Sequence, residues 1–156
     1  MIINENANYS EKDVMPLVEE CLAGGMDVRM KVSGISMTPI LHNIKDSVVL
    51  TKTDRVKKYD IVLYKRANGK YILHRIIGRK KGAFVMAGDF EIEKEYPVYE
   101  DMIIAKVTSF CRNGKDYTPE DFVIRLYSVI WVLVFPVRQW ILYMLNCIRR
   151  IFHGKR

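Results

Sequence analysis

Cysteine and histidine are scarce in this chain of 156 residues, which contains three of each. Cys21, Cys111 and Cys147 lie far apart, are odd in number and show no Cys-x-x-Cys spacing, so neither a disulfide framework nor a zinc site is predicted. The histidines show no metal-ligand spacing with Asp, Glu or Cys either. We therefore expect no metal and no cofactor.

The chain also lacks the features of two other classes of protein. No charged segment followed by an apolar one marks a secretory signal peptide at the N-terminus. The net charge is +7, but no stripe of Lys and Arg alternates with stacking aromatic residues, so a nucleic-acid partner is not predicted. Basic residues gather at 79–81 and at the C-terminal end, and the latter fits an anionic membrane surface.

Short apolar stretches fill the middle of the chain, and turn residues such as Asn68-Gly69 and Lys81-Gly82 separate them. This pattern is typical of β-hairpins. The length allows one small domain with one core. We therefore predict a mainly β fold, a coiled and barrel-like antiparallel β-sheet. The expected strands cover residues 28–32, 47–51, 60–64, 71–77, 83–86 and 103–108.

A helix is predicted before the first strand, because Ser10 or Asp13 can cap it and Gly24-Gly25 ends it. The last part of the chain is strongly apolar and begins with a helix start at Thr118-Pro119. The chain therefore divides into three segments: an N-terminal helix in 1–25, a β domain in 26–117 and an apolar helical tail in 118–156.

Ser36 lies at the end of the first predicted strand, in the sequence Gly-Ile-Ser-Met-Thr-Pro that spans 34–39. A serine at a strand end can be presented as a nucleophile. A single Gly-x-Ser is more often a turn whose serine bonds its own backbone. Asp46 and Asp60 each open a strand after a polar turn and are predicted to form turns rather than to act as acids.

Three further motifs follow Ser36, at 59–64 (Tyr-Asp-Ile-Val-Leu-Tyr), at 74–78 (His-Arg-Ile-Ile-Gly) and at 88–89 (Gly-Asp). In order and spacing, the four motifs resemble those of type I signal peptidases and the related self-cleaving domains of SOS-type repressors. The resemblance covers roughly residues 26–108. It implies a peptidase fold and a serine endopeptidase that removes a signal or leader segment from a polypeptide substrate.

The resemblance implies Ser36 as the nucleophile and His74 as the general base, as in the endoplasmic-reticulum and archaeal-type signal peptidases. An imidazole with a pKa near about 6.5 can take a serine proton at neutral pH. Lys65, Lys70 and Lys106 are alternative bases by residue type, but they lie outside the matched motif.

Strand alternation places His74 on one face of its strand with Ile72 and Ile76, while Arg75 points to the opposite face. We therefore expect His74 to be partly buried. Asp89 matches the family's late Gly-Asp motif and is predicted to orient the imidazole. The alternatives for this third group are Glu91, Glu93, Asp101 or none, which leaves a dyad.

The oxyanion position departs from the family pattern. Many signal peptidases have a serine two residues before the nucleophile, and this chain has Gly34 there. Backbone N–H groups, including that of Ser36, are therefore expected to bind the oxyanion. Two alternative functions remain open: a self-cleaving repressor-type domain, and a catalytically silent, membrane-bound binding module.

The apolar tail predicts contact with a membrane. Residues 126–148 are long enough to cross a bilayer, which takes about 20 apolar residues. Pro136 would kink a single span, and Arg138 at its centre would cost about 2.5–3.5 kcal/mol, so two shorter helical pieces in one leaflet compete with it. A helix packed over the β domain or in a dimer is the remaining alternative. We predict that residues 120–152 bind lipid and anchor the protein to the cytoplasmic membrane, with the β domain on its cytoplasmic face.

Overall fold

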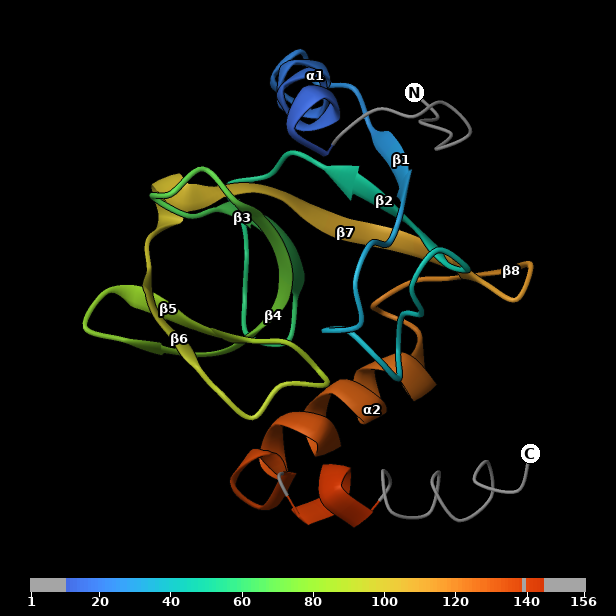
Figure 1. Ribbon diagram of the computed structural model, residues 1–156, viewed down its shortest axis with the longest axis vertical. Coiled ribbons are helices and arrows are strands. Elements are labelled where there is room, and N and C mark those ends of the chain that lie inside the picture. The colour runs from blue at the N-terminus through green and yellow to red at the C-terminus, as the bar shows by residue number, and fades with distance from the viewer. Residues whose placement is uncertain (1–10, 139, 145–156) are drawn as a thin grey trace.

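The computed structural model describes residues 11–138 and 140–144, and most of the elements in this part are strands. Figure 1 shows a strongly bent sheet between two helices. In chain order the elements are α1 (Glu11–Ala23), β1 (Val28–Lys31), β2 (Ser47–Thr51), β3 (Ile61–Lys65), β4 (Tyr71–Lys80), β5 (Ala83–Ala87), β6 (Glu95–Val98), η1 (Glu100–Met102), β7 (Ile103–Arg112), β8 (Lys115–Tyr117), α2 (Phe122–Leu133) and η2 (Phe135–Val137).

The eight strands form one sheet in the order β1-β2-β7-β3-β4-β5-β6, with β8 paired to β7. All of the strand pairs are antiparallel, so the predicted mainly β, antiparallel class is confirmed. The edge strands β1 and β6 do not pair with each other among the described residues. Register shifts interrupt four of the ladders, and such bulges increase the local bend and twist of a sheet.

β3 lies near the middle of the sheet and is buried on both faces. Ile61 and Leu63 belong to a core that α1 covers, whereas Val62 and Tyr64 belong to a second core on the opposite face. This alternation follows from the two-residue period of a strand. The neighbouring strand β4 has the same two faces. Each functional side chain on β4 therefore faces either the first core or the second core.

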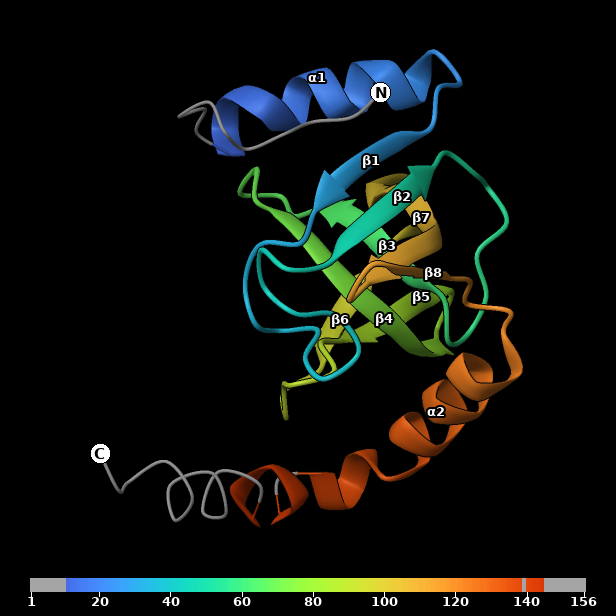
Figure 2. The ribbon, with the colours of Figure 1, turned by 90° about the vertical axis from the view of Figure 1, so that its right-hand side faces the viewer.

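α1 covers the first core with the apolar positions Met15, Val18 and Leu22, which lie three or four residues apart on one side of the helix. Figure 2 shows this helix lying across β1 and β2, at the end of the molecule opposite α2. Gly25 ends it with a φ of +79°, a conformation that L side chains rarely adopt. Asp13 lies inside the helix, so it is not the cap, and Ser10 falls outside the described residues.

Two strands were not predicted. β6 contains Pro97 and Glu95, residue types that are depleted in strands, and it lies at a sheet edge, where proline is tolerated. β8 is three residues long and pairs back on β7 through Asn113-Gly114, both with positive φ. An Asn-Gly pair is a strong hairpin signal, so the sequence did hold the information for β8.

The C-terminal segment, residues 122–138 and 140–144, is broken rather than continuous. α2 ends at Leu133, η2 follows with Pro136 in its first turn, and residues 140–144 are helical again. Among the described residues, no helix has both the length and the apolar character needed to cross a membrane. A single span over 126–148, one of the two membrane arrangements left open, is therefore not seen in its described part, and 145–148 and the basic end at 149–156 lie outside the described residues.

Candidate active site

Ser36 lies in an irregular segment after β1, partly exposed, at the start of a turn. The segment is held at its base by Val32, whose backbone N–H donates to Asp46 O and whose carbonyl accepts from Ile44 N. Gly34 has a φ of +88°, and its N–H donates to Asn43 Oδ1 at 3.0 Å. The Gly34 N–H is thus occupied, whereas that of Ser36 donates no hydrogen bond within the described part of the chain.

The turn of Ser36 packs directly against the Gly-Asp motif. Phe90 N donates to Ser36 O at 2.7 Å. A Cβ placed on Gly88 would lie only 2.7 Å from Ser36 O, so this close approach requires glycine at position 88. The same point lies 3.1 Å from the side chain of Glu91. Two motifs that are more than fifty residues apart are therefore in contact, with Glu91 beside them.

His74 lies on β4 directly opposite Val62 of β3, and the side chain faces the second core. Only 3% of the residue is exposed, so it is more deeply buried than the strand pattern predicted. Its Nδ1 lies 3.3 Å from Tyr64 Oη, and its Nε2 lies 3.4 Å from Glu91 Oε2. Burial lowers the pKa of His74, with Glu91 acting in the opposite direction, so the imidazole is neutral at neutral pH.

Ser36 and His74 are brought to the same neighbourhood but not into contact. No hydrogen bond joins Ser36 Oγ to the His74 ring within the described residues. Glu91 links the two positions indirectly, because its carboxylate lies 3.4 Å from Nε2 and its side chain lies beside Gly88, which packs against Ser36 O. Catalytic hydrogen bonds are often long in the absence of substrate and tighten when it binds.

Asp89, the predicted third group, faces the other side of the sheet domain. Its carboxylate accepts two hydrogen bonds from Arg75, at 2.9 and 2.7 Å, and one from Tyr127 at 3.1 Å. Among the described residues, no hydrogen bond or ion pair joins Asp89 to the ring of His74. Both Asp89 and Arg75 are almost fully buried, so the pair is a structural ion pair. Among the predicted acids, Glu91 is the one that lies against the imidazole.

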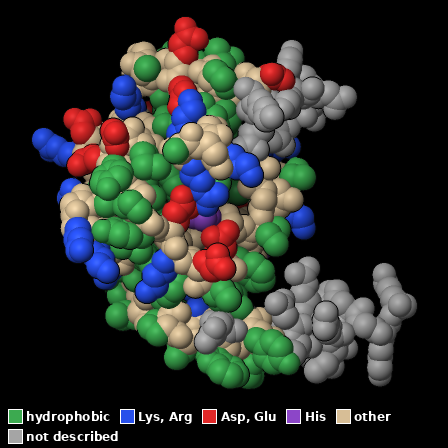
Figure 3. Space-filling view, turned by 60° about the vertical axis from the view of Figure 1, so that its left-hand side comes forward, with side chains coloured by type: hydrophobic (Ala, Val, Ile, Leu, Met, Phe, Trp, Pro, Cys, Tyr) green, Lys and Arg blue, Asp and Glu red, His purple; other side chains and the backbone are tan. Residues whose placement is uncertain are grey.

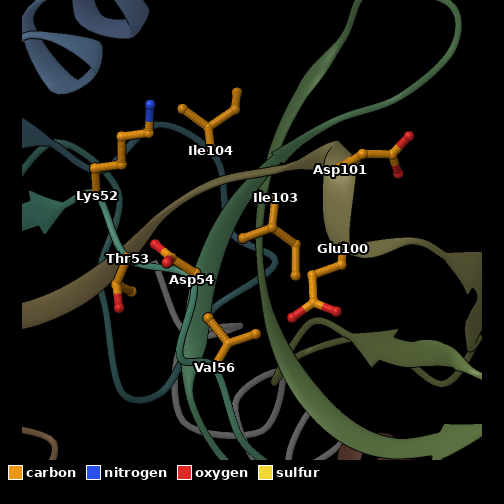
Figure 4. A pocket seen from close by; sticks show the side chains of 8 residues that line it. All are labelled: Lys52, Thr53, Asp54, Val56, Glu100, Asp101, Ile103 and Ile104. Carbon is orange, nitrogen blue, oxygen red and sulfur yellow. The ribbon is translucent and has the colours of Figure 1, made fainter.

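The other two candidate acids lie elsewhere. Glu93 is exposed. Asp101 and Glu100 line a pocket of about 270 Å³ between the loop after β2 and the start of β7, and Figure 4 shows Asp101 pointing away from the side chains of Asp54 and Glu100. The described residues contain no group of three or more His, Cys, Asp or Glu that could hold a metal ion.

The alternative bases have other partners or positions. Lys65 pairs with Glu19 of α1 at 3.0 Å, and Lys70 is exposed beside a turn. Lys106 lies 3.8 Å from the buried carboxylate of Asp60. Asp60 itself accepts a hydrogen bond from Lys57 N at 3.0 Å, which is the predicted turn-forming role.

Asp46 has the other predicted turn role. Its Oδ2 accepts hydrogen bonds from the backbone N–H and the Nδ1 of His42, at 2.7 and 3.2 Å. This buried carboxylate ties the loop after Ser36 back to the start of β2. The serine turn is thus held from both sides, by Asp46 and by the 88–91 turn.

The C-terminal segment binds the back of the 88–91 turn through polar groups. Arg138, fully buried, donates to the carbonyls of Gly88 and Glu91 at 2.9 and 3.1 Å. Trp131 Nε1 donates to Asp89 O at 2.8 Å, and Ser128 Oγ accepts from Arg75 at 2.8 Å. Arg138, whose charge was expected to disfavour a membrane span, thus binds the turn that carries Glu91.

Three residues of the site were missed from the sequence. Tyr64 lies beside His74, and its Oη donates to Glu95 Oε2 at 2.5 Å. Arg66 in turn holds Glu95 with two hydrogen bonds, at 2.8 and 2.5 Å. The two-residue period of β3 could have placed Tyr64 on the face of Val62, but Glu95 comes from β6, whose position depends on the tertiary fold.

Comparison of the chain with protein-family models, with curated proteins and with solved structures gave no match.

Proposed function

We propose that the protein is a serine endopeptidase resembling signal peptidase I, which removes a signal or leader segment from a polypeptide. The observation that carries this proposal is the convergence of Ser36, the Gly88-Asp89 motif and His74. The Phe90–Ser36 hydrogen bond and the Glu91–His74 contact bring these distant parts of the chain together. The bent antiparallel sheet fits the barrel-like peptidase fold that the resemblance implies.

In the proposed reaction, Ser36 Oγ attacks the scissile carbonyl while His74 Nε2 accepts the hydroxyl proton. The Ser36 N–H, which has no other acceptor in the described chain, donates to the carbonyl oxygen as it becomes negative. His74 then passes its proton to the leaving amine, and water hydrolyses the acyl-enzyme. Because Glu91 lies against Nε2, binding of substrate has to move this carboxylate aside.

Cleavage of a leader-bearing polypeptide by Ser36→Ala and His74→Ala variants tests the proposal. Each change should lower kcat/KM by about 10³-fold or more, and the double variant should be no worse, because the two residues act as a unit. Ser33→Ala, which changes an exposed serine on the same loop, is the matched control that should retain activity. Normal cleavage by either site variant contradicts the proposal.

A catalytically silent binding module is the second candidate, and the missing contact between Ser36 Oγ and His74 favours it. A fluorophosphonate or lactam serine probe distinguishes the two. Labelling at Ser36 that is lost in His74→Ala identifies an activated nucleophile and excludes the module. A protein that binds leader peptide but neither labels nor cleaves is the module.

We further propose that the C-terminal segment lies in the plane of an anionic membrane surface. Ser128, Trp131 Nε1 and Arg138 face the β domain, and the exposed apolar side chains of the segment recur mostly every three or four residues. Figure 3 shows hydrophobic side chains gathered at this end of the molecule. Trp and Tyr suit a membrane interface. The exposed positions are Phe122, Val123, Leu126, Ile130, Leu133, Val137, Trp140, Tyr143 and Met144.

Co-sedimentation with vesicles of phosphatidylglycerol and phosphatidylcholine tests the lipid proposal. Ile130→Asp with Leu133→Asp should release the protein from the vesicles, because two charges then face the acyl boundary. Ile92→Asp, an equally exposed apolar position on the 88–94 loop, is the control. A double variant that sediments like the parent protein contradicts the assignment of this surface.

A further inference from the structure

We propose that Tyr64 is a positioning residue for His74, which holds the imidazole in the tautomer with hydrogen on Nδ1 and leaves Nε2 as the basic atom. This inference rests on the proposed peptidase function, since it says how the base of that site is prepared. It assigns to Tyr64 and Glu95 the orienting role that the family resemblance implied for Asp89.

The direction of the hydrogen bonds follows from the chemistry of Glu95. An ionised carboxylate only accepts hydrogen bonds, so the 2.5 Å contact between Tyr64 Oη and Glu95 Oε2 uses the tyrosine proton. Tyr64 Oη can then offer only a lone pair to His74 Nδ1, at 3.3 Å. Nδ1 must therefore carry the hydrogen, and Nε2 of the neutral ring has none.

The charges around Tyr64 keep this direction fixed. Burial raises the pKa of Tyr64, and the hydrogen bond to Glu95 raises it further, so the phenol stays protonated. Burial acts against ionisation of Glu95, but the hydrogen bonds from Arg66 and Tyr64 prevail and lower the pKa of Glu95. Arg66 donates hydrogen bonds to this carboxylate from both Nε and Nη2. The polar chain thus has one favoured arrangement of protons, with Nδ1–H at its end.

The charged groups around His74 act on the two ring nitrogens in different ways: Glu91 lies 3.4 Å from Nε2 and attracts a proton there without forming a hydrogen bond, whereas the hydrogen bond of the ring is the one between Nδ1 and Tyr64. Glu91 and Glu95 face the ring from the 88–94 loop and β6, Arg66 from the end of β3, and Asp89 acts at longer range. Because Asp89 is committed to Arg75, it cannot hold Nδ1. Nε2 lies on the side of Glu91, whose side chain flanks Gly88, the residue that packs against Ser36 O.

The tautomer can be measured without any substrate. In the full-length protein labelled with ¹⁵N-histidine, correlations between ring nitrogens and ring carbons distinguish a protonated from an unprotonated nitrogen. We expect His74 to show hydrogen on Nδ1 in the parent protein, and Tyr64→Phe to convert it largely to the Nε2–H form or a mixture. His42, whose Nδ1 contacts Asp46 instead of Tyr64, is the internal control and should keep its signals.

Tyr64 is fully buried, so a second variant guards against a folding defect. Glu95→Gln keeps the tyrosine but weakens the anchor of its hydroxyl proton, and should shift the tautomer part of the way. Tyr96→Phe on the same strand, with an exposed ring, is the matched control. Hydrogen on Nε2 in the parent protein, or an unchanged tautomer in folded Tyr64→Phe, overturns the proposal.

Cleavage assays complete the test and separate it from the proposed function. Tyr64→Phe should lower kcat about tenfold, the loss expected for one buried hydrogen bond, with KM little changed. If Ser36→Ala still cleaves, the peptidase proposal fails, but the tautomer measurement stands on its own. If Ser36→Ala is inactive and Tyr64→Phe has the kcat of the parent protein, the positioning role fails alone.

Discussion

His74 and Arg75 are neighbours on β4, yet they belong to two buried polar clusters of opposite character. The Arg75 cluster is closed: Arg75 and Asp89 are 2% and 1% exposed at their side chains, and every bond joins a fixed donor to a fixed acceptor. The His74 cluster is accessible to solvent on one side. There the Glu91 side chain is 42% exposed, and its Oε2 lies 3.4 Å from Nε2. Closed pairs hold a structure together, whereas a neutral ring with a free basic atom can exchange a proton.

The comparison also shows how the two clusters depend on each other. The turn 88–91 contributes Asp89 to the structural cluster and Glu91 to the imidazole. Arg138 of the C-terminal segment holds this turn by its carbonyls. Binding of the C-terminal segment to lipid would therefore act on the same turn that borders Ser36 and His74.

The largest effect on folding is expected from Arg75→Met. It leaves the buried Asp89 carboxylate without its partner, which should lower the free energy of unfolding by about 3–5 kcal/mol. Arg79→Met on the same strand is the control, because Arg79 and Glu100 are more than half exposed, and it should cost about 0–1 kcal/mol. Urea unfolding gives both values. Equal losses in the two variants would show that the buried pair does not hold the turn.

A double-mutant cycle sharpens the separation of the two clusters. Asp89→Asn and Arg75→Met should couple by about 3 kcal/mol in unfolding free energy, because they break the same ion pair. Asp89→Asn and His74→Gln should couple by less than about 0.5 kcal/mol, since no contact joins them. If Asp89 orients the imidazole instead, Asp89→Asn will lose far more cleavage activity than stability explains, and the cycle with His74 will show the coupling.

The two clusters show which parts of the site could be predicted from the sequence and which could not. The two-residue period of β4 correctly placed His74 and Arg75 on opposite faces, and the turn residues located most of the hairpins. The alternation of side chains along a strand does not predict how the carboxylates of the following turn are oriented. The sequence therefore could not show whether Asp89 or Glu91 lies against His74. The partner of Arg75 on α2, Ser128, is 53 residues away and depends on docking of a helix that the sequence marked only as apolar.

The C-terminal segment should loosen when Arg138 is replaced by Met. The side chain donates three hydrogen bonds to carbonyls and stacks on Phe135 at 4.4 Å, so its loss should cost about 2 kcal/mol. Hydrogen exchange should accelerate in α2 and in the turn 88–91, and not in α1. Arg125→Met, an exposed position on α2, is the control. Unchanged exchange at 88–91 would mean that Arg138 does not hold this turn.

The smallest expected effect is a pH dependence of stability that belongs to His74. Burial lowers the pKa of His74 in the folded protein below its value of about 6.5 in the unfolded chain. Between these two pKa values the unfolded chain binds a proton that the folded protein does not, so acidification favours unfolding. The stability is complete above about pH 6.5 and falls as the pH drops toward the folded pKa.

Unfolding free energies at pH 7 and pH 5 measure this effect. The parent protein should lose about 1 kcal/mol more than His74→Gln over this range, because only the parent protein carries an imidazole at position 74. Because Arg66 keeps its charge throughout, the difference between the two proteins isolates the imidazole. Parallel losses would mean that the folded protein accepts the proton on His74 as readily as the unfolded chain. A smaller loss in the parent protein would mean that the Glu91–imidazolium pair outweighs burial, and that the ring is charged, and therefore no base, at the start of the reaction.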